Sequence, residues 1–106
     1  MRTKELWIKD EYLQMILAGR KTIEVRVGYS NITRLQAGDR LLLNGQHPYI
    51  IQRSERYASF EELLTHEEPA FIAPGMTASE LLDALRAIYS ADKESLGVVA
   101  LEIRPE

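Results

Sequence analysis

The chain has 106 residues and no cysteine, which suits one compact domain and excludes disulfides and thiolate metal sites. Its net charge of −3 and its charged fraction of 27% are typical of a soluble globular protein. No apolar run approaches the about 20 residues that a transmembrane helix needs. We therefore expect a single domain over residues 1–106 in the cytoplasm, with no secretory signal, no membrane partner, no metal and no cofactor.

The charges are unevenly divided along the chain. Residues 1–53 hold nine Lys/Arg against five Asp/Glu, whereas residues 54–106 hold four against eleven. The basic half can form a local patch for phosphate, although random variation of surface residues would give the same imbalance. Extensive non-specific wrapping of nucleic acid is disfavoured, because it needs many phosphate contacts.

The first elements are a strand, a helix and a second strand. The hydrophobic pattern predicts a strand at 4–8, in which Trp7 is expected to pack at the end of a barrel; a platform for base stacking is the alternative. Asp10 is a suitable N-cap for a helix over 10–18. Gly19 is expected to end this helix, because glycine readily adopts the left-handed conformation that follows many helices.

The next strand, residues 22–27, alternates strictly between apolar and polar side chains. Since successive residues of a strand point to opposite faces, its apolar residues should face a core and its polar residues should face away from it. The apolar set is Ile23, Val25 and Val27, and the polar set is Thr22, Glu24 and Arg26. This strand therefore displays a hydroxyl, a carboxylate and a guanidinium together, and it begins beside Lys21.

Residues 28–58 continue the sheet. A turn is followed by a helical turn at 32–35 and by a strand at 40–44 that is predicted to be buried on both faces. The dipeptide Asn44-Gly45 indicates a hairpin, with the loop lengthened by the residues after it. The following strand, at 49–58, is long enough that a bulge midway is expected.

The last part of the chain is mainly helical. Capping boxes predict helices over 60–66 and 77–88, the second with Ile88 in its buried stripe. Residues 70–75 are expected to be an irregular connector between two prolines, and 89–96 a polar loop before the final strand at 97–103. The order β-α-β-β-β-α-α-β predicts an α+β fold, a small mixed or antiparallel barrel of about five strands with two to three flanking helices.

One segment resembles the signature of a known family. Ile16-Leu17-Ala18-Gly19-Arg20-Lys21-Thr22-Ile23-Glu24-Val25-Arg26 is similar to the Gly-x-Lys-x-x-Glu-x-Arg motif of the ASCH domain. The Ala37-Gly38-Asp39 turn before a leucine-rich strand and the closing Leu101-Glu102-Ile103 also fit, so the resemblance extends from about Leu6 to Ile103. It implies a β-barrel with the fold of the PUA domains, which bind modified RNA.

A bacterial branch of that superfamily, the acetylcytidine amidohydrolases, is also similar over the segment from Met76-Thr77-Ala78-Ser79-Glu80-Leu81 through Ile88-Tyr89. Its catalytic lysine matches Lys21. Its catalytic threonine and glutamate fall on Glu24 and Pro74, so only one of three catalytic positions is kept. The resemblance therefore implies RNA or nucleotide binding first, with hydrolysis of an acylated nucleoside or of RNA as the alternative.

Physical chemistry assigns roles within the motif. Glu24 and Arg26 share a strand face, where a carboxylate can accept from an amino group of a base and a guanidinium can hold phosphate; a surface ion pair is the alternative. Lys21 is expected to contact a phosphate or an oxyanion, and in an enzyme Lys21 and Glu24 would be the catalytic residues. The expected ligand-binding residues are Arg20, Lys21, Thr22, Glu24, Arg26 and Tyr57.

The expected partner is RNA or a modified nucleoside or nucleotide. A protein-interaction module remains a third hypothesis, and the sequence leaves the oligomeric state open.

Overall fold

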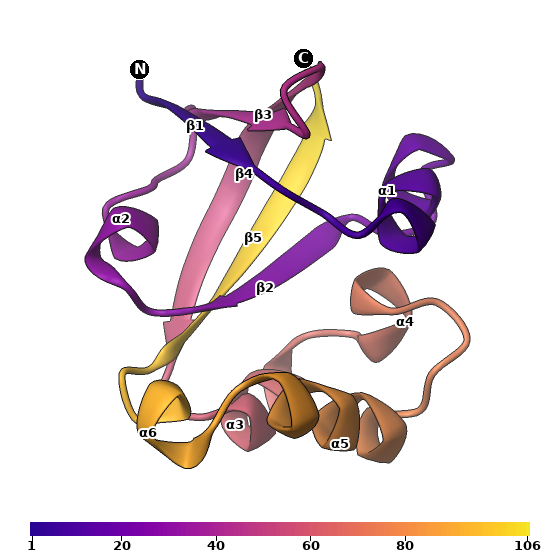
Figure 1. The fold of residues 1–106 in the computed structure, drawn as a ribbon, viewed down its shortest axis with the longest axis vertical. Helices are drawn as coiled ribbons and strands as arrows, with labels where there is room; N and C mark the ends of the chain where they lie inside the picture. The colour runs from indigo at the N-terminus through magenta and orange to yellow at the C-terminus, as the bar shows by residue number, and fades with distance from the viewer.

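A single five-stranded sheet curls into a half-barrel in the computed structural model, which describes all 106 residues (Figure 1). The strands are β1 (Thr3–Leu6), β2 (Ile23–Val27), β3 (Arg40–Leu43), β4 (His47–Tyr57) and β5 (Val98–Pro105). They lie in the order β1-β3-β4-β5-β2, with β1 and β3 parallel and every other pair antiparallel. The predicted α+β class with a mixed sheet is confirmed.

Six helices cover the two faces of this sheet. They are α1 (Asp10–Leu17), α2 (Ser30–Thr33), α3 (Phe60–His66), α4 (Pro69–Ile72), α5 (Ala78–Ile88) and α6 (Ala91–Glu94). Figure 1 shows α3, α5 and α6 in one layer at the lower end of the molecule, with α4 beside them and α1 and α2 farther up. None of the helices is long and apolar enough to cross a membrane.

The side chains of β5 separate two hydrophobic clusters. Because the strand alternates, Val99, Leu101 and Ile103 enter one cluster, and Val98 and Ala100 enter the other. The first cluster fills the half-barrel and is closed by α1 and α2, whereas the second lies between the sheet and α3, α4 and α5. The apolar residues of β2 all belong to the second cluster, so the polar residues of β2 point into the half-barrel.

Two segments that the sequence predicts to be irregular contain helices. Residues 70–75 were expected to be a connector, but α4 forms there because Pro69 occupies the first turn, where its missing N–H has no helical partner to lose. The predicted polar loop at 89–96 contains α6, whose first turn is capped by the Ser90 hydroxyl. The helical turn predicted at 32–35 begins earlier, as α2.

Several local predictions of burial and capping need correction. Ile88, at the last position of α5, is 70% exposed and is not part of the buried stripe. β3 is not buried on both faces: Leu41 and Leu43 are fully buried, but Leu42, which points to the opposite face, is only half-buried. Asp10 is the first residue of α1 and its side chain caps no backbone N–H.

The longest strand, β4, carries the expected irregularity. Its register against β5 shifts between Ile51 and Arg53, which confirms the predicted bulge. The strand begins earlier than predicted, at His47, because Asn44 and Gly45 both take positive φ angles and turn the chain tightly.

The half-barrel is open between its first and last strands. β1 and β2 stand at the two ends of the strand order, and no ladder joins them. We call the gap between these two edges the seam. One hydrogen bond crosses it, from Nη2 of Arg26 in β2 to the carbonyl oxygen of Trp7 just after β1, at 2.8 Å. Three of the predicted site residues, Lys21, Glu24 and Arg26, lie beside this seam.

Candidate functional site

The chain reverses at Gly19 to place the motif residues at the seam. Gly19 has φ +79°, so the left-handed ending predicted for the first helix is confirmed. The N–H of Arg20 and the N–H of Lys21 both donate to the carbonyl of Met15 in α1. This tight ending brings Lys21 directly to the start of β2, with its side chain turned inward.

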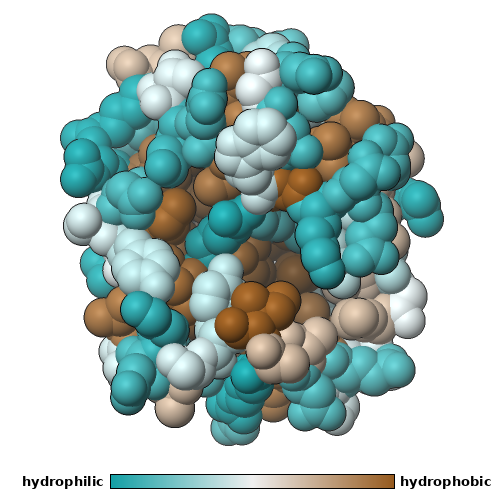
Figure 2. All heavy atoms as spheres, in the orientation of Figure 1, coloured by the Kyte–Doolittle hydropathy of each residue, from teal (hydrophilic) through white to brown (hydrophobic).

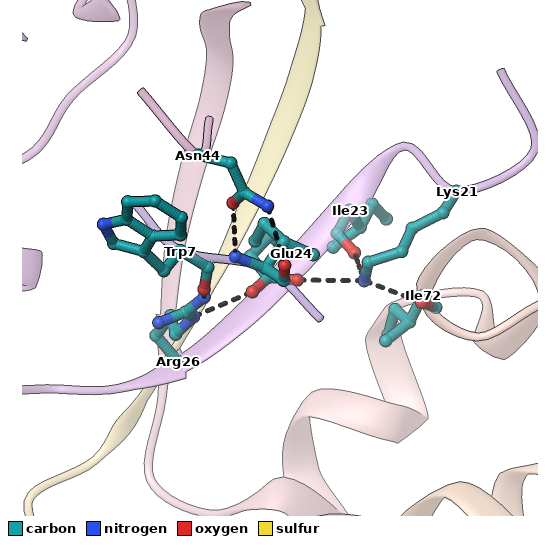
Figure 3. Close-up of polar contacts among 8 residues, drawn as sticks. Trp7, Lys21, Ile23, Glu24, Arg26, Asn44 and Ile72 are labelled. Carbon is teal, nitrogen blue, oxygen red and sulfur yellow. Dashed lines mark hydrogen bonds and ion pairs between the residues drawn. The ribbon is translucent and has the colours of Figure 1, made fainter. Parts of the chain in front are cut away.

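The Lys21 ammonium is buried and fully engaged with the protein (Figure 3). Its Nζ donates to the carbonyl oxygens of Ile23 and Ile72, each at 2.7 Å, and lies 3.0 Å from Oε1 of Glu24. Only 5% of the side chain is exposed. An ammonium has three N–H groups, and each has an acceptor here. In this arrangement Lys21 holds Glu24 and ties β2 to α4, and it has no N–H left for a ligand.

Glu24 and Arg26 form a partly buried pair beside it. Nε of Arg26 donates to Oε2 of Glu24 at 2.8 Å, and the Glu24 side chain is only 11% exposed. The alternative of a solvated surface pair therefore does not describe this carboxylate. In Arg26, Nε donates to Glu24 and Nη2 donates to the Trp7 carbonyl, whereas Nη1 donates to no protein atom. Of the two cations that contact Glu24, Arg26 is thus the one with donors left for a ligand.

A side chain that the sequence analysis assigned only to a turn fixes the opposite side of the seam. Asn44 accepts from the Ile8 N–H at 2.7 Å through Oδ1 and donates to the Ile8 carbonyl at 2.9 Å through Nδ2 (Figure 3). These two hydrogen bonds imitate a strand pairing beyond the end of β1. It sets the position of Trp7, whose carbonyl oxygen receives Arg26.

The three charged residues lie in the wall of an apolar cavity of about 350 Å³. Figure 2, which has the orientation of Figure 1, shows the molecule hollowed near the middle of the face in view, with apolar surface inside. Most lining residues are apolar or aromatic and come from the start of the chain, β2, α4 and α5: Trp7, Ile8, Lys9, Tyr12, Lys21, Glu24, Val25, Arg26, Ile72, Ala73, Leu81, Ala84, Leu85, Ile88 and Tyr89. An apolar hollow with a few polar groups is typical of a small-molecule site.

The aromatic residues at the cavity are absent from the predicted ligand-binding set, although base stacking was the alternative role for Trp7. Trp7 is 69% exposed, so the prediction that it packs at the barrel end is wrong. Tyr12 lies at the edge of α1, with Nζ of Lys21 at 6.0 Å from its ring. Tyr89 follows α5, and burial raises the pKa of its hydroxyl. Their positions depend on contacts between distant segments, and neither spacing nor periodicity indicates them.

Three of the predicted ligand-binding residues do not line the cavity. Arg20 is exposed on the turn, and the backbone N–H of Thr22 donates to the Phe71 carbonyl at 2.9 Å. Tyr57 lies elsewhere in the fold, where its hydroxyl donates to the buried carboxylate of Glu67. The structure therefore brings together Lys21, Glu24 and Arg26 from the predicted set, and leaves the other three outside the cavity.

Tyr57 belongs to a separate charged network. Arg53 donates to both oxygens of Glu67, at 2.9 and 2.7 Å, and to Oε1 of Glu102 at 2.8 Å. The Arg53 guanidinium is the main reason that the pKa of Glu67 lies below its usual value. Burial, with the bond to Glu67, raises the pKa of Tyr57 to about 12. Every strong donor here meets an acceptor within the protein, so the network fixes β4 to β5 and to the end of α3.

No three His, Cys, Asp or Glu side chains are grouped so that they could hold a metal ion. The cavity lining also contains no Ser, Thr, Cys or His. Its chemistry is that of a carboxylate, a guanidinium and aromatic rings in apolar surroundings.

Comparison with known protein families shows to which family the chain belongs. The model of the ASCH domain matches residues 6–106, which is nearly the whole chain. The chain belongs to the ASCH domain family. No match was found among curated protein sequences.

Two solved structures share this ASCH fold over almost their full lengths. The crystal structure of the hypothetical protein PH0355 has 30% sequence identity and a TM-score of 0.92, with 98% of this chain and 99% of that chain covered. The solution NMR structure of protein PF0455 from Pyrococcus furiosus has 29% identity and a TM-score of 0.80, with coverages of 97% and 96%. The match to each structure therefore extends over nearly the whole of both chains.

Proposed function

We propose that this ASCH domain binds RNA or a nucleotide, with a base held in the cavity at the seam. The observation that carries the proposal is the Glu24–Arg26 pair in the wall of an apolar cavity of about 350 Å³. A base needs an apolar slot with a few polar groups, and a nucleotide also needs a donor for its phosphate. The cavity combines both, and membership of the ASCH family supports an RNA ligand.

Glu24 and Arg26 would divide the recognition between them. Each Glu24 oxygen receives one cation and keeps a further lone pair, which can accept from an exocyclic amino group of a base. The free Nη1 of Arg26 can donate to phosphate oxygens. Tyr12 and Tyr89 supply aromatic surface for the base. Lys21 would act as a positioning residue, since its N–H groups already hold Glu24 and two carbonyls.

Binding is favoured over hydrolysis by the groups available in the cavity. No serine, threonine or cysteine lines the cavity to act as a hydroxyl or thiol nucleophile. The Lys21 amine is also engaged, because its Nζ contacts two backbone carbonyls and Glu24. At the positions that match the catalytic residues of the acetylcytidine amidohydrolases, Glu24 replaces a threonine and Pro74 replaces a glutamate. Pro74 is not among the lining residues.

Titration calorimetry with the Arg26→Ala variant tests the proposal. The ligands are the common ribonucleosides, their 5′-monophosphates, acetylcytidine and short single-stranded RNA. A charged hydrogen bond contributes about 1.5–3 kcal/mol, so Arg26→Ala should weaken nucleotide binding about 10- to 150-fold. Arg56→Ala is the matched control, because Arg56 is exposed, does not line this cavity and makes no ion pair; the affinity of this variant should equal that of the wild type.

The same mixtures should be analysed for product after long incubation. We expect acetylcytidine and RNA to be recovered unchanged. Deacetylated nucleoside or cleaved RNA that disappears in Glu24→Gln would identify a hydrolase instead. If the wild type binds no member of the panel, or if Arg26→Ala and Arg56→Ala bind equally well, the proposed function is wrong.

A further inference from the structure

A second cavity continues the first along the seam. It has a volume of about 290 Å³ and lies between the edges of β1 and β2, on the side of α2. The two cavities share three lining residues, Trp7, Arg26 and Tyr89. They therefore meet at the one hydrogen bond that crosses the seam, from Arg26 to the Trp7 carbonyl. The seam holds two adjoining compartments with a guanidinium between them.

The second compartment has the side chains that a stacked base requires. Trp7 is 69% exposed and Tyr29, on the opposite wall, is 42% exposed. Trp7 is the only Trp of the chain, and it leaves most of its ring exposed instead of packing it in the core. Exposed apolar surface of this kind is typical of a binding site. Nζ of Lys93 lies 5.3 Å from the centre of the Tyr29 ring, which brings a cation to the rim. Aromatic rings of this kind stack on any base, because every base has a π-face.

The charges along the seam also favour an anionic ligand. Lys4, Lys9, Lys21 and Arg26 line the two cavities, against Glu5 and Glu24. Glu24 is already neutralised by two cations, so Glu5 is the one lining carboxylate without a cationic partner. The chain as a whole carries −3, so the positive lining is a local feature and not a consequence of composition.

We propose that the seam binds a dinucleotide unit of single-stranded RNA, with one base in each cavity and the linking phosphate at Arg26. The proposal rests on the proposed function and specifies its ligand: a chain of at least two nucleotides and not a free nucleoside. Nη1 of Arg26 is suited to the linking phosphate, because Arg26 lines both compartments and its other donors are fixed to Glu24 and Trp7. The second base would stack against Trp7 and Tyr29.

A ladder of ligands tests this placement. Calorimetry should first identify the 5′-monophosphate that binds tightest. That nucleotide is then joined to each of the four nucleotides in turn, on its 5′ side and on its 3′ side, and these dinucleotides are titrated. We expect the best dinucleotide to bind about 10-fold or more tighter than the monophosphate. Because Trp7 is the only Trp and its ring is exposed, its fluorescence should be quenched and shielded from iodide by the dinucleotide more than by the monophosphate.

Tyr29→Ala separates the two compartments, because Tyr29 lines only the second. It should bring dinucleotide affinity down to that of the monophosphate and leave monophosphate affinity within twofold of the wild type. Tyr29→Phe should retain the gain, since the ring is kept. Phe71→Ala is the control: Phe71 is an exposed aromatic residue outside both cavities, and its loss should change neither affinity.

The outcomes distinguish this inference from the proposed function. If monophosphate and dinucleotide bind equally to the wild type, or if Tyr29→Ala weakens both equally, the second base has no site at the seam and the inference is overturned. The proposed function then stands as long as Arg26→Ala still weakens monophosphate binding. If neither ligand binds, both are overturned.

Discussion

Replacing Lys21 by methionine would show how much of the fold depends on the buried ammonium. Met keeps a similar aliphatic stem but leaves the Ile23 and Ile72 carbonyls without their donor and Glu24 with one cation instead of two. Breaking a buried ion pair by removing one partner costs about 3–5 kcal/mol. We expect that loss from the free energy of unfolding, which for a domain of this kind is about 5–15 kcal/mol.

Urea and thermal unfolding followed by circular dichroism would measure the effect. A change of 1 kcal/mol shifts the Tm of a small domain by about 4–8 °C, so Lys21→Met should lower the Tm by at least about 12 °C. Lys9→Met is the control, because Lys9 is exposed, and its stability should stay within about 0.5 kcal/mol of the wild type. A loss below about 1 kcal/mol in Lys21→Met would refute the structural role and return Lys21 to direct contact with the ligand.

A double-mutant cycle with Glu24→Gln makes the test specific. Lys21→Met leaves a buried carboxylate that lacks one of its two cations, and Glu24→Gln removes that carboxylate charge. The double variant should therefore lose less stability than the two single variants combined, by about 1–3 kcal/mol. Simple additivity would mean that the two side chains stabilise the domain independently, against the 3.0 Å contact between them.

Two further predictions concern the network around Glu67. Arg53 is the main cause of the lowered pKa of Glu67, so the ionised carboxylate stabilises the fold above pH 4.5, and this contribution is lost as the pH falls through the folded-state pKa. Glu67→Gln should therefore lower the free energy of unfolding by about 2 kcal/mol at pH 7. It should also flatten the acid limb of a plot of unfolding free energy against pH. The pKa of Tyr57 is raised from 10.0 to about 12, so its protonated hydroxyl stabilises the fold below pH 10, and this contribution is lost between pH 10 and 12. Tyr57→Phe should remove that part of the alkaline loss of stability. Unfolding curves recorded from pH 8 to 12 would measure it. Unchanged limbs in these variants would contradict the assigned bonds.

The parts of the fold that the sequence predicted are those set by neighbours along the chain. The alternation of β2, the ending of α1 at Gly19 and the capping box at Thr77 each depend on residues within a few positions of one another. In the capping box, for example, the Glu80 N–H donates to the Thr77 hydroxyl at 3.1 Å and the Thr77 N–H to the Glu80 carboxylate at 2.9 Å. The motif was found for the same reason, because its residues lie within one helix ending and one strand.

The parts that were missed depend on contacts between distant segments. The carbonyl that receives Lys21 belongs to Ile72, 51 positions away, and the side chain that fixes Ile8 belongs to Asn44, 36 positions away. Neither residue type indicates such a role: any residue has a carbonyl, and Asn44 before Gly45 is typical of a hairpin. The exposure of Trp7 follows from where these bonds place the chain after β1, so no periodicity could predict it.

The same contacts explain why a carboxylate can occupy position 24, where the sequence resemblance to the acetylcytidine amidohydrolases places a threonine. At 11% exposure a lone carboxylate would lose most of its hydration, and a threonine hydroxyl would need no such compensation. This chain provides a cation for each oxygen, and both cations are anchored on backbone carbonyls: Lys21 on those of Ile23 and Ile72, and Arg26 on that of Trp7. Glu24 is thus oriented before any ligand arrives, which lowers the cost of ordering the site on binding. The glutamate, its two cations and the segments that carry those carbonyls form one unit, so replacement of Glu24 alone would leave a buried ammonium and a half-buried guanidinium without their shared partner.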